Sequence, residues 1–217
     1  MWSSEVTNMI ITGIWETLYM TLVSTLVGYV IGLPMGIILT VSDKDGIKPN
    51  AVLYKVLDVI ANIVRSVPFI ILLVLLIPFT RLVVGKSYGS TATIVPLVIA
   101  AAPYIARMVE SSLKEVDAGV IEAARSMGAS NFTIITKVML VEARTSLLVG
   151  ATITLGTILG YSAMSGAVGG GGLGAIAIRY GYPRWQTDIM IVTVILLIIL
   201  FQIFQTVGMK LADKFDH

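Results

Sequence analysis

Cysteine is absent from the 217 residues of this sequence, and histidine occurs once, at His217. The chain therefore has no disulfide, no thiolate metal ligand and no cysteine nucleophile, and any metal site would depend on carboxylates alone. Charge is scarce as well. Charged residues make up 13% of the chain, whereas a soluble domain carries about 25%. With so few charges to cover a globule, lipid must contact much of the surface.

Basic residues are missing from the first 43 positions, and no basic run occurs later in the chain. A cleavable signal peptide begins with a positively charged stretch. We therefore expect the amino-terminal segment to belong to the mature protein and to prefer the outer side of a membrane. A nucleic-acid surface needs clustered Lys and Arg, so no nucleic-acid partner is expected.

Long apolar segments are what the sequence does contain, since hydrophobic residues make up 56% of it and the mean hydropathy is +0.91. A helix needs about 20 mainly apolar residues to cross a membrane. Five segments meet this requirement and predict an all-α integral membrane protein with a single transmembrane domain, residues 1–217. The expected crossings are residues 9–41, 58–80, 87–113, 143–165 and 188–210, with long loops at 114–142 and 166–187.

The side of each loop follows from the basic residues, because short cytoplasmic loops collect Lys and Arg. With the amino terminus outside, eleven basic residues lie on or near the cytoplasmic side and four lie outside. The eleven are Lys44, Lys48, Lys55, Arg65, Arg107, Lys114, Arg125, Lys137, Arg144, Lys210 and Lys214; the four are Arg81, Lys86, Arg179 and Arg184. We therefore expect the carboxyl terminus and loop 114–142 in the cytoplasm, and loop 166–187 outside.

Loop 114–142 has the composition of two helices joined by a turn. The stretch Gly119–Met127 consists mainly of good helix formers, and Gly128 can close that helix in the left-handed conformation. Ser130 or Asn131 can cap a second helix that leads into the fourth crossing. The loop is therefore predicted to hold a short helix at the cytoplasmic surface, followed by a sharp turn.

Four residues of this loop, Glu122, Ala123, Ala124 and Gly128, resemble the EAA motif of ABC importer permeases, whose loop docks on a separate ATPase. Segments elsewhere resemble the methionine-uptake branch of that family: Arg65–Phe69, Ala102–Arg107 and Gly160–Met164 with the glycine run after it. Two departures are Val141, where the family usually has proline, and Ser165, where glycine is expected. From spacing alone, an interfacial helix with an ordinary glycine cap fits the loop equally well.

The resemblance implies the ABC importer type I permease fold, with a coupling helix in the loop, in the bacterial cytoplasmic membrane. It implies a homodimer, two cytoplasmic ABC ATPase subunits that bind ATP and Mg²⁺, and a substrate-binding lipoprotein outside. No catalytic residue and no cofactor are expected in this chain. The implied function is import of methionine, L- and D-, by alternating access. A permease for another amino acid or small nutrient stays open as an alternative.

Candidate pathway residues lie in the second and fourth crossings: Ser66, Pro68, Tyr161, Ser162 and Met164. A methionine side chain is polarizable, so Met164 suits the path of a thioether substrate; ordinary helix packing explains each residue equally well. We expect the crossings to hold no charge that could pair with the ammonium or carboxylate group of a substrate. Selection is therefore assigned to the external partner. Asp58, Glu110 and Asp188 are expected to be solvated at helix ends.

Glycines recur at four-residue spacing in the first crossing, at Gly28, Gly32 and Gly36, and in the fourth, at Gly156 and Gly160. Small residues at this spacing allow helices to approach closely in lipid. For the first crossing we favour packing within one subunit over packing between two.

Two stretches look like nucleotide-binding motifs. Thr80–Ser87 ends like a P-loop without its first glycine, and Gly169–Gly174 fits a dinucleotide pattern. Neither follows a predicted strand and both are expected outside, so the second is interpreted as a flexible external turn. An intramembrane protease is disfavoured because no histidine is present to activate a serine and no carboxylate pair lies within a crossing. An ion-driven carrier that acts alone is disfavoured because it usually holds ionisable residues near the midplane.

Overall fold

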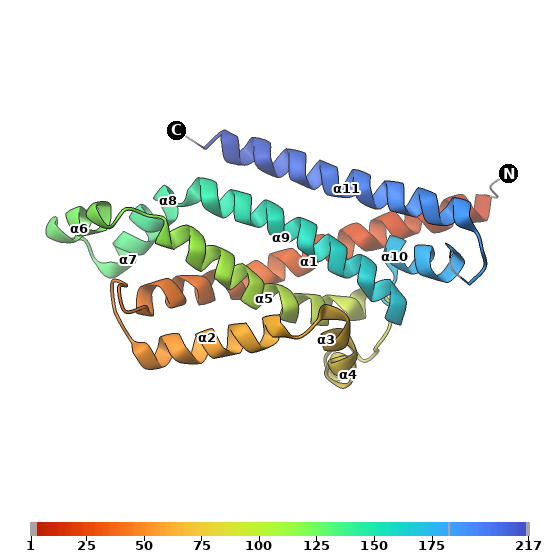
Figure 1. The fold of residues 1–217 in the computed structure, drawn as a ribbon, viewed down its shortest axis with the longest axis horizontal. Helices are drawn as coiled ribbons and strands as arrows, with labels where there is room; N and C mark the ends of the chain where they lie inside the picture. Colours follow the sequence, from red (N-terminus) through yellow and green to blue (C-terminus); the bar gives the residue numbers. More distant parts are fainter. Residues whose placement is uncertain (1–3, 182, 216–217) are drawn as a thin grey trace.

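The computed structural model describes residues 4–181 and 183–215, and every regular element within these ranges is helical. Long helices run back and forth along the bundle (Figure 1). They are α1 (Ser4–Ser42), α2 (Ala51–Ser66), α5 (Ser90–Lys114), α9 (Arg144–Ser165) and α11 (Thr187–Asp213). The short elements are α3 (Phe69–Leu75), α4 (Ile77–Val84), α6 (Ala118–Ser126), α7 (Asn131–Thr133), the π-helix η1 (Ile134–Met139), α8 (Leu140–Glu142), the 3-10 helix η2 (Gly166–Val168), α10 (Gly172–Ile176) and the π-helix η3 (Ala177–Gly181). The expected all-α architecture is confirmed.

The second expected crossing, residues 58–80, is not one helix. It falls in α2, α3 and α4, and the chain bends by 101° between α2 and α3. Pro68 has no N–H to donate and disfavours helical dihedrals in the residue before it. Val67 is accordingly extended, with φ −83° and ψ 124°. By length and composition, four helices of the described chain can cross a membrane, or five if α2 and α3 count as one broken span.

Close packing of α1 on α5 forms the centre of the bundle. A Cβ atom on Gly32 would lie 2.6 Å from the Ala102 carbonyl oxygen, and one on Gly36 would lie 2.6 Å from that of Ala106. These glycines therefore let two backbones touch within one chain, as expected for the first crossing. The buried core continues onto α9, where Ile158 is buried.

The outer helix α11 packs against α9 through a second pair of glycines. A Cβ atom on Gly156 of α9 would lie 2.5 Å from Phe201, and one on Gly208 of α11 would lie 2.0 Å from Thr152. By contrast, a Cβ atom on Gly160 would meet nothing within 4 Å. Gly156 is therefore a packing glycine, whereas Gly160 lies on a face of α9 that the chain itself leaves open.

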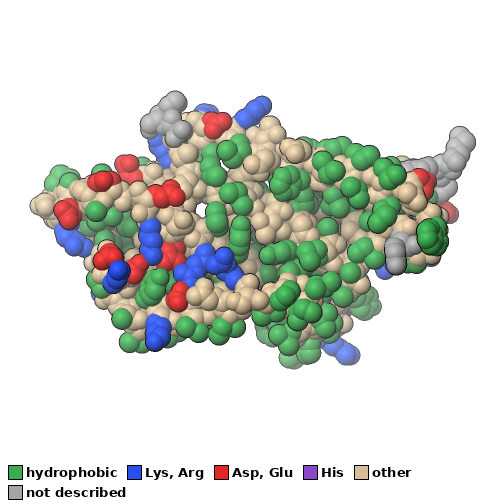
Figure 2. Space-filling view, viewed as in Figure 1, with side chains coloured by type: hydrophobic (Ala, Val, Ile, Leu, Met, Phe, Trp, Pro, Cys, Tyr) green, Lys and Arg blue, Asp and Glu red, His purple; other side chains and the backbone are tan. Residues whose placement is uncertain are grey.

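The two ends of the bundle differ in composition. The α6 end, as we call it, carries α6, the end of α11 and the α1–α2 connection (residues 43–50); the α10 end carries α10 and the start of α1 (Figure 1). Figure 2 shows Lys, Arg, Asp and Glu gathered over the half of the molecule around the α6 end, and hydrophobic side chains over much of the rest. This segregation is typical of a protein whose apolar part lies in lipid.

The glycine-rich segment at the α10 end is ordered and packed, so its interpretation as a flexible turn is wrong. Gly172 and Gly174 are buried in α10, and a Cβ atom on Gly174 would lie 2.1 Å from the Ala163 carbonyl oxygen. The first N–H groups of α10 are satisfied by α1: Gly172 donates to the Glu16 carboxylate at 2.7 Å and Leu173 donates to Thr17 Oγ1 at 2.9 Å. The glycines serve close packing.

Candidate coupling and transport site

The loop that carries the EAA-like residues folds into a helix, a glycine turn and a second helix, as the sequence predicts. α6 begins at an Asp117 cap, whose carboxylate accepts from the Gly119 N–H at 2.7 Å. It ends at Ser126, and two residues later Gly128 has a left-handed φ of 81°, which disfavours any side chain with a branched Cβ. Ser130 then caps the next helix, accepting from the Thr133 N–H at 3.2 Å. We call residues 118–133 the elbow.

The four motif residues face in two directions. Ala124 is buried against the core beside the start of η1, whereas Glu122, Ala123 and Gly128 are exposed. A small side chain at Ala124 lets α6 lie flat on the bundle, and the others remain available to a partner. Ala124 therefore packs the elbow on the bundle, whereas the other three motif residues are accessible on its surface.

Two large apolar side chains of the elbow project outward, and sequence reasoning did not single them out. Met127 is 82% exposed and Phe132 is 75% exposed, on either side of the glycine turn. Exposed aromatic and methionine side chains are typical of protein interfaces. The signal that could have found them is their position: both flank a turn whose neighbouring helix already carries the EAA-like residues.

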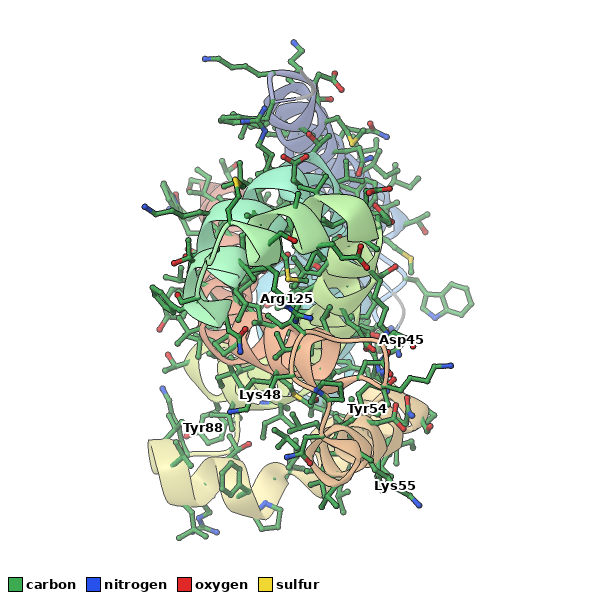
Figure 3. The ribbon with its side chains drawn as sticks, turned by 90° about the vertical axis from the view of Figure 1, so that its left-hand side faces the viewer. Asp45, Lys48, Tyr54, Lys55, Tyr88 and Arg125 are labelled. Carbon is green, nitrogen blue, oxygen red and sulfur yellow. The ribbon has the colours of Figure 1, made fainter. Side chains whose placement is uncertain are left out.

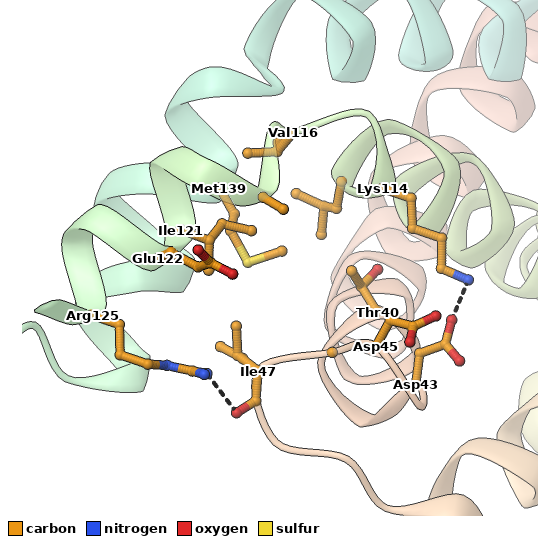
Figure 4. A pocket seen from close by; sticks show the side chains of 13 residues that line it. Thr40, Asp43, Asp45, Ile47, Lys114, Val116, Ile121, Glu122, Arg125 and Met139 are labelled. Atoms are coloured by element: carbon orange, nitrogen blue, oxygen red, sulfur yellow. Dashed lines mark hydrogen bonds and ion pairs between the residues drawn. The ribbon is translucent and has the colours of Figure 1, made fainter.

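A pocket of about 480 Å³ separates the elbow from the α1–α2 connection (Figure 4). One hydrogen bond crosses it, from the Arg125 guanidinium to the Ile47 carbonyl oxygen at 3.0 Å. In Figure 3, which looks onto the α6 end, Arg125 lies between the elbow and this connection, whereas Lys55 points away from the bundle. The elbow is thus attached here by one polar contact.

An ion-pair network joins three helices next to the elbow. Arg107 of α5 donates to Glu110 at 2.7 Å and reaches across to the Asp58 carboxylate of α2. Lys114 bridges Glu110 at 2.8 Å and Asp43, just after α1, at 2.6 Å. The hydrogen bond from Lys114 lowers the pKa of the Asp43 carboxyl. We call Asp43, Asp58, Arg107, Glu110 and Lys114 the α5 charge network.

This network corrects the expectation that Asp58 and Glu110 are simply solvated. Glu110 is 5% exposed and is bonded by Arg107, Lys114 and the Tyr54 hydroxyl. A buried carboxylate is retained only when it is paired. The sequence shows the i, i+3 and i, i+4 spacing of the three α5 residues, but not the partners from α1 and α2. Asp188 has an interaction partner as well.

The expected pathway residues fall into two groups. Ser66, Pro68 and Met164 are exposed, and Met164 lies one turn after Gly160 on the open face of α9. Tyr161 stacks on Phe69 with ring centroids 4.5 Å apart, which places the start of α3 beside α9. Ser162 is 1% exposed and donates to the Leu159 carbonyl oxygen, so it faces the packed interior in this structure.

The structure is thus a helical membrane protein with an exposed elbow at one end. The open face of α9 lies beside the break between α2 and α3. Residues 28–214 match the family model described as "Binding-protein-dependent transport system inner membrane component". The chain belongs to this family. This permease is therefore a membrane component of a transport system and not an enzyme.

Individual relatives agree over the full length of the permease. It is 49% identical over 216 residues, 100% of this chain and 96% of the relative, to a probable D-methionine transport system permease protein, MetI, of Vibrio cholerae. The same named protein of Pasteurella multocida is 49% identical, with 93% of each chain covered. An inward-facing structure of the MetNI methionine ABC transporter matches with a TM-score of 0.98 and 49% identity, covering 100% of both chains. The expected ABC importer permease fold is confirmed.

Proposed function

We propose that this permease imports methionine across the bacterial cytoplasmic membrane, as the transmembrane subunit of an ATP-driven complex. The observation that carries the proposal is the full-length likeness to proteins named for D-methionine transport. The exposed thioether of Met164 beside the open position of Gly160 supports a path for a thioether substrate. Both L- and D-methionine are assigned as substrates.

The proposed complex is a homodimer of this chain with two ATPase subunits, which bind ATP and Mg²⁺, and an external substrate-binding lipoprotein. One chain leaves a face of α9 open at Gly160 and Met164, and a second copy opposite it would enclose a path. The exposed side chains of the elbow, Met127 and Phe132, fit the ATPase interface. No cofactor is assigned to this chain.

The proposed orientation has the α6 end in the cytoplasm and the α10 end outside. The loops and helix termini at the α6 end carry most of the Lys and Arg residues, in agreement with the bias of cytoplasmic loops. α1 begins at the α10 end and α11 ends at the α6 end (Figure 1). This orientation places the elbow where an ATPase can reach it, with α2 and α3 together forming the second of five crossings.

Transport then proceeds by alternating access. ATP-driven closure of the ATPase pair pulls on the elbow and shifts the population of inward- and outward-facing states. A shift from 1:99 to 99:1 requires about 5.5 kcal/mol of differential binding, which the ATPase supplies through the elbow.

Uptake by the reconstituted complex tests the substrate assignment. The complete complex in proteoliposomes should accumulate labelled methionine only with ATP and the binding protein. Unlabelled L- and D-methionine should compete for uptake, while histidine and leucine should not. Stronger competition by another amino acid would contradict the methionine assignment.

Charge reversal on the elbow tests the coupling assignment. Glu122→Lys should abolish ATP-dependent uptake and weaken co-purification with the ATPase, because the carboxylate is exposed at the mouth of the pocket between the elbow and the α1–α2 connection. Glu5→Lys makes the same charge change on an exposed residue of α1 at the opposite end and should leave both unchanged. Normal uptake with Glu122→Lys would show that the elbow does not transmit the movement.

Backbone geometry of the elbow offers a second test. Gly128→Val forces a β-branched residue into a φ of 81°, at a cost of about 1–2 kcal/mol, and should straighten or shift the turn so that uptake is lost. Gly128→Asn is the matched control, because asparagine tolerates the left-handed region; it should retain most of the uptake. Equal loss in both variants would mean that the size of the side chain matters there and the turn does not.

A further inference from the structure

Arg65 lies far from the α6 end along the axis of the bundle, although the sequence analysis places it on or near the cytoplasmic side. α2 begins at Ala51 at the α6 end, and Arg65 is its penultimate residue, which places it about 21 Å along the helix. Asp58 is level with Arg107, to which it is bonded, and Arg65 lies about two turns beyond Asp58. Because α2 and α5 run in opposite directions (Figure 1), that level corresponds to Ala100.

That level is the middle of the apolar part of the bundle. α5 carries no charged residue from Ser90 to Ala106, and Ala100 is near the centre of that stretch. On α1, Gly28 packs on Ala101, and α1 is uncharged from Thr17 to Ser42. A guanidinium at this depth cannot face hydrocarbon without a large cost, and ionisable residues at such positions face a partner or a water-filled path.

Arg65 has no partner among the described residues of its own chain. Its side chain is exposed, and within residues 4–181 and 183–215 it makes neither an ion pair nor a hydrogen bond. Arg107, by comparison, is held by Asp58 and Glu110. Of these two arginines, one therefore stabilises the fold and the other is unused by it.

The faces of α2 show what Arg65 looks onto. Its large exposed apolar residues share one side of the helix, within an arc of about 120°: Val52, Leu53, Val56, Val59, Ile60 and Ile63. Its polar residues share an adjacent side, within an arc of about 100°: Lys55, Asp58, Asn62, Arg65 and Ser66. The apolar side suits lipid, whereas the polar side must face water or polar groups. Ser66 donates to the Asn62 carbonyl oxygen. Among the described residues, Lys55 and Arg65 are the two cations of this side without a partner, and Arg65 is the one level with the apolar middle of the bundle.

We propose that Arg65 binds the carboxylate of the transported amino acid as it passes the α2–α3 break. The inference rests on the proposed function and names the substrate group that this position recognises. The guanidinium offers two parallel N–H groups that match a carboxylate. The Phe69–Tyr161 stack sets the chain just beyond Arg65 against α9, whose open face carries Gly160 and Met164. The expectation that the crossings hold no charge for the substrate is thereby replaced.

Thiol labelling tests the location of Arg65, because the chain has no cysteine of its own. Arg65→Cys and the matched control Ile63→Cys, on the apolar side of α2, are each reconstituted in the full complex and treated with a hydrophilic, membrane-impermeant thiol reagent. Arg65→Cys should be labelled and Ile63→Cys should not. Methionine delivered by the binding protein should slow the labelling at position 65. An unreactive Arg65→Cys, as when a second copy covers it, or equal reactivity at both positions would overturn the proposal.

Uptake kinetics test the role of the charge. Arg65→Met should lower the maximal methionine uptake about tenfold or more, and Arg65→Lys about twofold to threefold, as expected for loss or weakening of a charge-assisted contact. The half-saturating methionine concentration should stay the same, because the binding protein sets it. Lys55→Met removes an exposed cation from the α6 end of the same helix and should transport normally. Full uptake by Arg65→Met overturns the inference, whereas absence of uptake by the unsubstituted complex would overturn the proposed function.

Discussion

The two ends of this bundle are held together by different physics. At the α10 end, the contacts are made by the backbone of α10: it packs on the backbone of α9 at Gly174, and its first N–H groups donate to Glu16 and Thr17 of α1. At the α6 end, the contacts are electrostatic and partly exposed: the α5 charge network and the Arg125–Ile47 hydrogen bond. Backbone packing has one arrangement, whereas ion pairs re-form after small movements. The contacts of the α6 end can therefore be exchanged at a smaller cost than those of the α10 end.

The chain between the elbow and α9 is not a regular α-helix. η1 is a π-helix between α7 and α8, and Ala143 interrupts the helical dihedrals before α9. π-helical segments are found at functional sites more often than chance predicts. The α10 end has a π-helix as well, η3 after α10, so a π-helix by itself does not distinguish the two ends. The break at Ala143 means that the elbow and α9 are not parts of one continuous helix.

The largest expected effect comes from breaking the steric end. Gly174→Val places a branched side chain where even a Cβ atom would lie 2.1 Å from the Ala163 carbonyl oxygen. Overpacking against backbone has no cheap relaxation, so we expect a loss of at least about 4 kcal/mol and little folded protein. Gly160→Ala, which meets only open space, is the control. The melting temperatures of the two variants in detergent are the measurement. Similar melting temperatures would mean that close packing at Gly174 does not hold the α10 end together.

A smaller effect is expected from the electrostatic end. Arg107→Met leaves the buried Glu110 and the half-buried Asp58 with fewer partners, and removal of one member of a buried pair costs about 3 kcal/mol. Lys44→Met breaks only the exposed Lys44–Asp45 pair and should change the melting temperature little. The double variant Arg107→Met with Glu110→Met should recover part of the loss, because the most deeply buried unpaired charge, that of Glu110, is then removed, and only the half-buried Asp58 has lost its cation. A double variant less stable than Arg107→Met would contradict this account.

The sequence predicts the elbow better than its surroundings, for a physical reason. The cap at Ser130, the left-handed Gly128 and the helix before it depend on local preferences that neighbouring residues reveal. The partners of Glu110 come from α1 and α2, far away in sequence. Their identity depends on helix rotation, which composition does not determine.

Long helices overlap four of the apolar segments expected from hydropathy, residues 9–41, 87–113, 143–165 and 188–210. The second segment, by contrast, is not continuous. Residues 58–80 read as one crossing because the average is insensitive to the backbone at Pro68, where the chain turns by 101°. The position of Arg65 differs for another reason. α2 begins at Ala51, seven residues before the expected crossing, so Arg65 lies farther from the α6 end than a start at Asp58 implies. Consecutive glycines predict a flexible turn when they are considered alone. In the fold, the absence of side chains at these positions instead allows α10 to pack closely on α9.

The smallest expected effect concerns the exposed edge of the α5 charge network, and it depends on pH. Asp43 has a lowered pKa in the folded protein because Lys114 donates to it. The pair therefore contributes stability above the unfolded-state pKa of about 3.9, and this contribution is lost as the pH falls through the lower folded value. Because Lys114 is 42% exposed on its side chain, the contribution should be about 0.5–1 kcal/mol. Asp43→Asn should lower the melting temperature slightly at pH 7, and the difference from the unsubstituted protein should narrow below about pH 4. If the difference in melting temperature persists unchanged at pH 3, Asp43 acts through packing and not through its charge. The electrostatic contribution to the α6 end would then be smaller than we infer.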